Sequence, residues 1–237
     1  MTDEEFRAQA IGFAKREGNR IAREFTDPAV YAPSGVAISV FMAGSPGAGK
    51  TEFSKNLISI LEEDKDRRVI RIDGDEFRSS IPGYTGNNSH IVQGAISLIV
   101  EKLHDHVLHR GQNFILDGTF AKYERAIKNI DRSLEKKRPV FIFYLYQKPE
   151  VAWKFTKARE KEEGRNVSKP VFIELFLGAR DTINRIRDEF GKEVIVFLVK
   201  KDFEKNTVEK LVIIEPGQSI DDYLEHHYTK DELEKLL

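Results

Sequence analysis

Short apolar segments alternate with longer amphipathic stretches along most of the chain. The apolar segments have the length of strands and are nearly unbroken, as in a parallel sheet that is buried on both faces. They lie at residues 36–43, 69–72, 114–116, 140–146 and 194–199. Between them, apolar residues recur at helical spacing, as at Phe53, Leu57, Ile60 and Leu61. This alternation predicts right-handed βαβ crossovers and a parallel sheet flanked by helices.

The two ends of the chain add elements to this core. A helix is expected from Thr2 to about Glu24, because Thr2-x-x-Glu5 has the spacing of a capping box. Residues 207–214 are expected to form an added strand that pairs as an antiparallel hairpin with the strand before it. A second capping box at Thr229 predicts a short C-terminal helix.

We therefore expect one α/β domain over residues 1–237, with a mostly parallel five-stranded sheet, helices in the two outer layers and an added C-terminal antiparallel strand. Residues 1–33 form an N-terminal helical extension in this interpretation, and residues from about 150 to 170 form a lid region. There is no internal repeat or long linker.

A glycine-rich segment follows the first predicted strand and matches G-x-x-x-x-G-K-[ST] in full. It consists of Gly44, Ser45, Pro46, Gly47, Ala48, Gly49, Lys50 and Thr51. In a phosphate-binding loop (P-loop) of this kind the backbone N–H groups point at phosphate oxygens and the following helix adds its positive end. Lys50 is expected to bridge the β- and γ-phosphates of ATP, and the Thr51 hydroxyl to bind Mg²⁺. The motif and its context predict the fold of P-loop NTPases, with ATP and Mg²⁺ as cofactors.

Carboxylates follow the next two predicted strands. Asp73, Asp75 and Arg78 come after the second strand, and Asp117 and Thr119 after the third. In a parallel sheet these positions face the same crevice as the P-loop. One aspartate there can take the proton of an acceptor hydroxyl, and Asp117 can hold Mg²⁺ or orient the substrate. The alternative is ordinary turn chemistry, in which Asp75 caps the next helix.

The predicted lid carries two arginines, Arg159 and Arg165, in a strongly charged stretch. Arginines on a mobile lid stabilise the charge of a phosphoryl group in transfer. A solvated helix with i,i+4 ion pairs explains the same residues equally well.

Composition and charge exclude several other classes. The formal net charge is -1, without the basic excess typical of proteins that grip nucleic acid. The chain has no cysteine, so disulfides and thiolate metal sites are excluded. The acidic N-terminus does not resemble a secretion signal, and the apolar runs are too short to span a bilayer. We therefore expect a cytoplasmic protein with no membrane or nucleic-acid partner. The guanine-specific N-K-x-D sequence is absent, which disfavours a GTPase.

Three histidines, His104, His106 and His109, lie near the end of one predicted helix. His104 and His106 point to different faces of a regular helix and so do not chelate one ion. We attribute the three to a solvated helix terminus.

Taken in order, these motifs resemble the zeta toxin family of kinases, over about residues 36–215. The resemblance rests on Gly44 to Thr51, on Ile-Asp-Gly-Asp-Glu-Phe-Arg leading to Ile-Pro-Gly-Tyr at 81–84, on Asp117-Gly-Thr119, and on the two lid arginines. It implies phosphorylation of the sugar 3′-hydroxyl of UDP-N-acetylglucosamine or a related sugar nucleotide, and an antitoxin protein as partner.

The resemblance also implies roles for individual residues. Lys50 would grip phosphate, Asp75 would be the catalytic base, and Arg159 and Arg165 would close on the transferred phosphate. The residues expected to bind the substrate are Asp73, Asp75, Arg78, Glu101, Asp117 and Thr119. The family has an arginine shortly after the threonine that corresponds to Thr119, whereas this chain has Lys122.

Two alternatives remain open at this stage. The Asp73-Gly-Asp75 motif followed by Arg78 is also similar to adenylylsulfate kinases, and antibiotic phosphotransferases share the architecture. A regulatory module that binds nucleotide without any acceptor would need the P-loop but not Asp75.

Overall fold

The computed structural model describes residues 2–64, 67–164, 166–202 and 207–237. Its helices are α1 (Asp3–Phe25), α2 (Lys50–Leu61), α3 (Ser89–His109), α4 (Tyr123–Glu135), α5 (Pro149–Glu163), α6 (Lys169–Phe190) and α7 (Lys230–Leu236). Its strands are β1 (Ser39–Ala43), β2 (Val69–Asp73), β3 (Asn113–Asp117), β4 (Val140–Tyr146), β5 (Val194–Asp202) and β6 (Thr207–Ile214). Short 3₁₀ helices are η1 (Gly74–Ser80), η2 (Gly191–Glu193) and η3 (Ile220–Tyr223).

The strands form one sheet in the order β2-β3-β1-β4-β5-β6. The first five strands along this order are parallel, and β6 runs antiparallel to β5. The predicted fold class is confirmed, including the added C-terminal strand. Because the five parallel strands end at one edge of the sheet, the segments that follow them are brought side by side.

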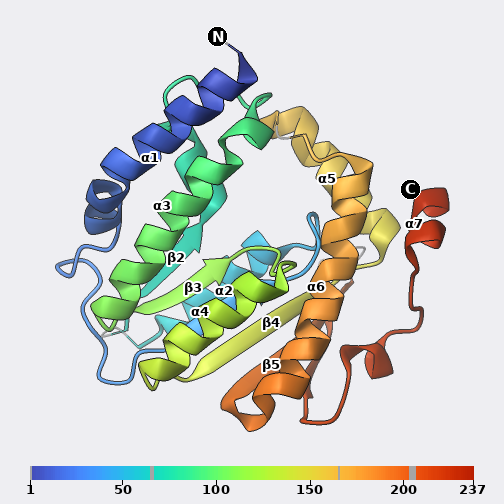
Figure 1. Ribbon diagram of the computed structural model, residues 1–237. Helices are drawn as coiled ribbons and strands as arrows, with labels where there is room; N and C mark the ends of the chain where they lie inside the picture. Colours follow the sequence, from blue (N-terminus) through green and yellow to red (C-terminus); the bar gives the residue numbers. More distant parts are fainter. Residues whose placement is uncertain (1, 65–66, 165, 203–206) are drawn as a thin grey trace.

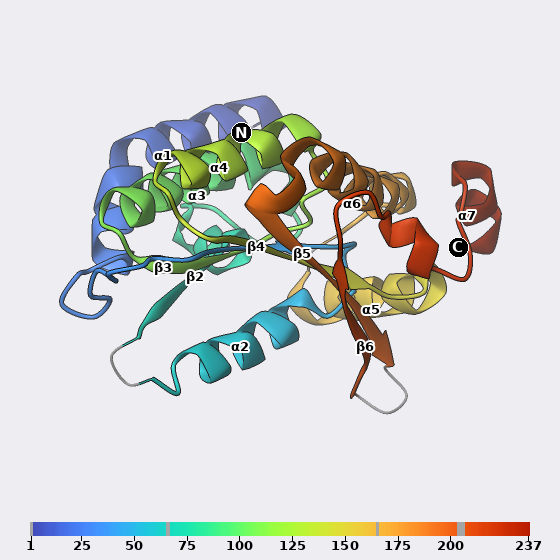
Figure 2. The same ribbon diagram turned by 90° about the horizontal axis from the view of Figure 1, so that it is seen from below.

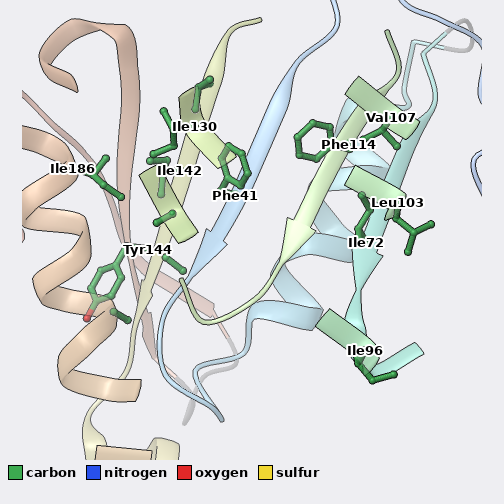
Figure 3. Close-up of a cluster of buried hydrophobic side chains, with 14 of the residues drawn as sticks. Phe41, Ile72, Ile96, Leu103, Val107, Phe114, Ile130, Ile142, Tyr144 and Ile186 are labelled. Carbon is green, nitrogen blue, oxygen red and sulfur yellow. The ribbon is translucent and has the colours of Figure 1, made fainter. Parts of the chain in front are cut away.

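Helices cover both faces of the sheet. Figure 2 shows α2 on one side and α1, α3, α4 and α6 on the other. The larger core lies under α3, α4 and α6 and contains fully buried Phe41, Ile72, Leu103 and Phe114, which Figure 3 shows converging between strands and helices. A smaller core lies between the sheet and α2.

The N-terminal helix packs along α3 (Figure 1). Its predicted capping box at Thr2 and Glu5 is present. Small buried residues let the two helices approach closely, and a Cβ added at Gly18 would lie 3.5 Å from Cγ of Lys102. Near the start of α1, the Phe6 ring lies against Gly83 in the segment after η1. Helix α1 therefore packs against the segment that follows β2 and supports it.

The first strand is shorter than its apolar run suggests. The run begins at Val36, but Val36 is 70% exposed and the strand starts at Ser39. The Ile38 N–H donates to the side chain of Asn113, at 3.0 Å, instead of to the backbone of a neighbouring strand. The apolar run therefore made the predicted strand begin too early, before the point at which its partner β3 begins.

His104 corrects our interpretation of the three histidines. Its side chain is buried, and the ring contacts those of Phe41 and Phe114. Burial, with the nearby charges of Arg132 and Arg138, lowers the pKa of His104 to about 3. The solvated-terminus explanation is wrong for this residue, because apolar packing holds it as a neutral ring.

His104 is expected to make the protein less stable in acid. Between pH 6.5 and about 3 the unfolded chain binds a proton at this position and the folded chain does not. The free energy of unfolding should therefore fall as the pH falls through this window, by about 1.4 kcal/mol per pH unit from this group alone. Urea unfolding of the native chain and of His104→Leu tests this. The variant should lose less stability on acidification, and equal pH slopes for the two proteins would contradict the prediction.

Among the residues that the structure describes, no helix is both long enough and apolar enough to cross a membrane.

Candidate functional site

The P-loop lies between the end of β1 and the start of α2. Lys50 is the first residue of α2, and Gly49 before it adopts a left-handed conformation with φ 82°. The Lys50 Nζ donates to the carbonyl oxygens of Gly44, at 2.9 Å, and Ser45, at 2.7 Å. The loop is therefore curled around its own lysine, at the positive end of the helix dipole.

Gly47 shows how closely the loop approaches α5. Its φ is +72°, and a Cβ at this position would lie 2.0 Å from the carbonyl oxygen of Ala152 and 2.8 Å from Oγ1 of Thr156. Only a glycine allows both this backbone conformation and this contact. The P-loop is thus packed directly on α5, the base of the predicted lid.

A buried arginine on β2 organises the carboxylates beside the P-loop. The Arg71 Nη2 bonds Asp73 and Asp117, each at 2.6 Å, and its Nη1 bonds Glu76. Its Nε donates to Ser54 Oγ of α2 at 3.0 Å. Arg71 therefore ties together the ends of β2 and β3 and the helix that follows the P-loop.

Charges shape this cluster. Burial raises the pKa of Asp73, and the neighbouring charges of Asp75 and Asp117 add to the effect. Burial works against the charge on Arg71, but attraction to Asp117 and Asp73 outweighs it and raises the pKa of Arg71. The Ser54 hydroxyl also donates to Asp117, at 3.0 Å. The cluster holds negative charge next to a place where phosphates would bind, and Arg71 keeps it compact.

Removing the Arg71 side chain is expected to lower the free energy of unfolding. Arg71→Met would leave Asp73 and Asp117 without their cation, and breaking such a buried pair costs about 3–5 kcal/mol. The loss of stability should shrink as the pH falls, because protonation removes the unpaired charge. Urea unfolding at several pH values measures it.

Arg68→Met is the matched control for this prediction. Arg68 lies just before the same strand, but it is half exposed and faces Glu62 at 3.7 Å. Such surface pairs contribute about 1 kcal/mol or less. Equal losses in the two variants would contradict the role given to Arg71.

Asp75 lies in η1, the short helix directly after β2. Its backbone N–H donates to Asp73 Oδ1 at 2.9 Å, so Asp73 rather than Asp75 caps this helix. The Asp75 Oδ1 accepts from Arg78 Nε at 2.9 Å, and its Oδ2 lies 3.9 Å from Arg159 Nη2 of α5. The fold thus brings together an aspartate and an arginine of the predicted lid that are far apart in the sequence.

Two hydrogen bonds to α3 fix the guanidinium group of Arg78. Its Nη1 donates to the carbonyl oxygen of Ser89, at 2.9 Å, and its Nη2 to Gln93, at 2.8 Å. The residue is only 5% exposed. Its place is that of a positioning residue that aims Asp75, and direct contact with a substrate stays a prediction.

The segment after β3 touches the P-loop. The Gly44 N–H donates to the carbonyl oxygen of Thr119 at 3.0 Å. The next residue, Phe120, has φ 58°, an uncommon conformation for a bulky side chain, and its ring stacks on Phe41 at 5.4 Å. Packing of this ring therefore sets how the chain leaves the crevice.

A cavity of about 600 Å³ opens between the predicted lid and the segment after η1. Its lining consists of Asn87, Lys157, Glu160, Lys161, Gly164 and Asn166. The α5 residues in this set lie on one helical face, a few positions from Arg159. The volume falls within the range of small-molecule sites.

Two predicted site residues lie apart from this cluster or cannot be placed. Glu101 is on the outer side of α3, where it pairs with Lys128 of α4 at 3.2 Å and is half exposed. Its role as a substrate ligand stays a prediction. Arg165 lies outside the described residues. Lys122, at the position of the family arginine, pairs with Glu174 of α6.

The site offers hard oxygen donors for a divalent cation. Thr51 lies in the first turn of α2, and Asp117 is held nearby through Ser54, whose hydroxyl oxygen also lies 3.0 Å from the Thr51 carbonyl oxygen. In the described part of the chain, no group of three or more acidic or histidine side chains forms a metal site by itself. Mg²⁺ is usually bound by one or two protein ligands together with phosphates and water, a number that Thr51 and Asp117 would supply.

Sequence reasoning missed Arg71 and Ser54. The signal for Arg71 was present, because an arginine inside the apolar run Val-Ile-Arg-Ile must find partners if the strand is buried on both faces. Its partners, however, come from β2, β3, α2 and η1, and only the folded chain shows which they are.

Comparisons with known proteins agree with this architecture. The chain is similar to a structure from the PezAT chromosomal toxin-antitoxin system of Streptococcus pneumoniae, with 20% identity, a TM-score of 0.68, and coverage of 100% of this chain and 93% of that one. It is also similar to the AvrRxo1-ORF1:AvrRxo1-ORF2 complex crystallised with sulphate ions, with 13% identity, a TM-score of 0.60, and coverage of 98% and 78%. The same complex with ATP gives 14% identity, a TM-score of 0.58, and coverage of 96% and 74%.

No match was found among curated protein sequences. The structural likenesses, all at low identity, establish the fold. The family model described as Zeta toxin matches residues 21–213, which is most of the sequence. The chain therefore belongs to the zeta toxin family.

Proposed function

We propose that this protein is an ATP-dependent kinase that transfers the γ-phosphate to a hydroxyl group of a small molecule. The acceptor we propose is the sugar 3′-hydroxyl of UDP-N-acetylglucosamine or a related sugar nucleotide. Family membership supports a kinase-type function. The observation that carries the proposal is the Asp75 carboxylate, held by Arg78 and facing Arg159 at the edge of the sheet where the P-loop lies.

The P-loop binds the nucleotide in this proposal. Backbone N–H groups of the loop and the start of α2 hold the phosphates, and Lys50 exchanges its bonds to Gly44 and Ser45 for bonds to phosphate oxygens. Thr51 and Asp117 would hold Mg²⁺, which neutralises phosphate charge when bound. The similar AvrRxo1 complex has a crystal structure with ATP, which is consistent with this assignment.

Asp75 acts as the base in the transfer step. As the acceptor oxygen forms its bond to the γ-phosphorus, the bond from that phosphorus to the β–γ bridging oxygen breaks and ADP leaves. The hydroxyl proton passes to the Asp75 carboxylate. Arg159 stabilises the charge on the phosphoryl group, and Arg78 keeps Asp75 aimed.

The cavity beside the lid suits an anionic acceptor. Two lysines and one glutamate line it, and Lys157 pairs with Glu160, so Lys161 adds the net positive charge. A diphosphate linked to a sugar fits this chemistry better than a neutral alcohol. An antitoxin protein is proposed as partner, since the S. pneumoniae relative comes from a toxin-antitoxin system.

The proposal is tested by incubating the protein with Mg²⁺-ATP and single acceptors. The panel contains UDP-N-acetylglucosamine, other sugar nucleotides, adenylylsulfate and an aminoglycoside, with product detected by its gain of one phosphate. We expect phosphorylated UDP-N-acetylglucosamine or a related sugar nucleotide from the native chain and none from Lys50→Ala. Phosphorylation of adenylylsulfate or the aminoglycoside alone would overturn the acceptor assignment. ATP binding with no product from any acceptor would overturn the assignment of kinase activity.

A further inference from the structure

One wall of the cavity beside the predicted lid is a short turn, residues 83–88, which lies between η1 and α3. Asn87 of this turn lines the cavity. The backbone of the turn is left-handed at Gly83 and at Gly86, each with φ 84°. These two residues allow the change of direction but have no side chain with which to anchor the turn. Its position therefore depends on contacts from neighbouring elements.

Asn88 closes the turn on itself. Its side chain accepts a hydrogen bond from the Thr85 N–H, at 3.0 Å, and donates one to the Gly83 carbonyl oxygen, at 2.8 Å. The Ser89 N–H donates to the Gly86 carbonyl oxygen at 3.0 Å. These bonds fix the shape of the turn, because they join residues within it or next to it. They do not by themselves fix the turn against the rest of the protein.

Two elements from distant parts of the sequence contact the turn. Gly164, which ends α5, lies so close that an added Cβ would be 3.6 Å from Cα of Gly86 and 3.7 Å from Oδ1 of Asn87. From α1, the ring of Phe6 packs on Gly83, where an added Cβ would lie 2.9 Å from Cε2 of the ring. Phe6 is only 4% exposed. The ring therefore covers the Gly83 backbone and leaves no room there for a side chain.

Helix α1 holds Phe6 in a fixed place. The capping box of Thr2 starts the helix, so that Phe6 falls in its first two turns. The rest of the helix runs parallel to α3, and Figure 1 shows the N-terminal ends of both helices at the same end of the molecule. This packing uses a stripe of small buried residues at every fourth position: Ala10, Ala14, Gly18 and Ala22. Phe6 is thus anchored by the whole length of α1.

We propose that Phe6 is a positioning residue of the acceptor site. Its ring holds Gly83, and through the turn it sets where Asn87 stands in the wall of the cavity. Phe6 precedes residue 21, where the family match begins, so this support comes from a part of the chain outside the match. The inference rests on the proposed binding of the acceptor in this cavity.

A change at Phe6 should act on acceptor binding rather than on the transfer step. The proposed base, Asp75, is held by Arg78, whose other bonds go to Ser89 and Gln93 of α3 and not to the turn. The support of Asp75 is therefore separate from the contact between Phe6 and Gly83. Loss of that contact should raise KM for the acceptor and leave kcat nearly unchanged.

The test measures KM and kcat for UDP-N-acetylglucosamine at saturating Mg²⁺-ATP with the native chain, Phe6→Ala and Phe6→Leu. We expect Phe6→Ala to raise KM about tenfold, with kcat within about twofold of the native value. Phe6→Leu keeps an apolar side chain over Gly83 and should recover most of the native KM. Isothermal titration calorimetry should give the native Kd for Mg²⁺-ADP in both variants.

Gly83→Ala approaches the same contact from the other side. The added methyl group would meet the Phe6 ring, and an alanine is strained at φ 84°, so KM should rise here too. In the double variant Phe6→Ala/Gly83→Ala the ring is gone, and the rise in KM should be smaller than the product of the two single effects. A rise equal to that product would overturn the direct contact on which the inference depends.

Phe13→Ala is the matched control. Phe13 lies two turns further along the same face of α1, about 10 Å from Phe6, and packs against the same core. Its truncation should lower the midpoint of thermal unfolding, as that of Phe6 does, but leave KM for the acceptor unchanged. An equal rise in KM in both variants would mean that general loosening of α1 is responsible, and would overturn a specific role for Phe6.

The outcomes separate this inference from the proposed function. An unchanged KM in Phe6→Ala would overturn the positioning role while leaving the proposed kinase activity in place. If the native chain does not phosphorylate UDP-N-acetylglucosamine, the proposed acceptor fails, and the role of Phe6 toward it fails as well.

Discussion

Asp75→Asn is expected to lower kcat by about 10²–10⁴-fold, the usual contribution of a general base. Asparagine keeps the size of the side chain and can still accept a hydrogen bond from Arg78, but it cannot take a proton from the acceptor hydroxyl. The Kd for ADP should stay close to the native value, because the phosphates are proposed to bind on the P-loop side of the crevice. Steady-state kinetics with the acceptor found in the panel, together with calorimetry of ADP binding, measure both quantities.

Asp181→Asn is the control for this prediction. Asp181 is an exposed aspartate on α6 that also lies beside an arginine, Arg180, at 3.4 Å, but it is not part of the crevice. Its replacement should leave kcat unchanged. A native-like kcat in Asp75→Asn would show that Asp75 is not the base and would favour a module that binds nucleotide without transferring phosphate.

Gly47→Ala is expected to weaken nucleotide binding strongly and to destabilise the fold. The added Cβ would meet the Ala152 carbonyl at 2.0 Å, and an alanine is strained at φ +72°. Neither the loop nor α5 can move aside without altering the P-loop. A displacement of about 1 Å in such a site can cost 10²-fold in activity. We expect Kd for Mg²⁺-ADP to rise by about that factor, together with a lower midpoint of thermal unfolding.

Gly118→Ala is a matched control in the same crevice. A Cβ at Gly118 meets nothing within 4 Å, and its backbone is not in the left-handed region. The variant should keep native stability and native ADP affinity. If Gly47→Ala behaved like Gly118→Ala, the close packing of the P-loop on α5 would be incorrect.

The sequence was sufficient for most of the fold. Five apolar strands separated by amphipathic stretches predicted the parallel sheet, because strands buried on both faces are apolar at nearly every position. The P-loop was equally clear, since glycines, Lys50 and Thr51 must stand at fixed spacing between a strand and a helix. The capping boxes at Thr2 and Thr229 were confirmed for the same reason, as their interactions span only three residues.

Local pattern was less informative where burial decides the chemistry. His104 was predicted to be solvated near a helix end, but the rings of Phe41 and Phe114 pack against it. Val36 was predicted to belong to a strand, but the strand begins only at Ser39, opposite Phe114 of β3. In both cases the outcome depended on residues far away in the sequence.

By itself, the sequence determined which elements form and which of them carry the P-loop motif, because helical and strand periods and the P-loop spacing are properties of neighbouring residues. Tertiary structure alone decided which distant groups meet. It set Asp75 against Arg159, gathered Asp73 and Asp117 around Arg71, and laid the C-terminal segment against the ends of β4 and β5. These contacts follow from the order of strands in the sheet, which long-range packing fixes and which no local pattern encodes.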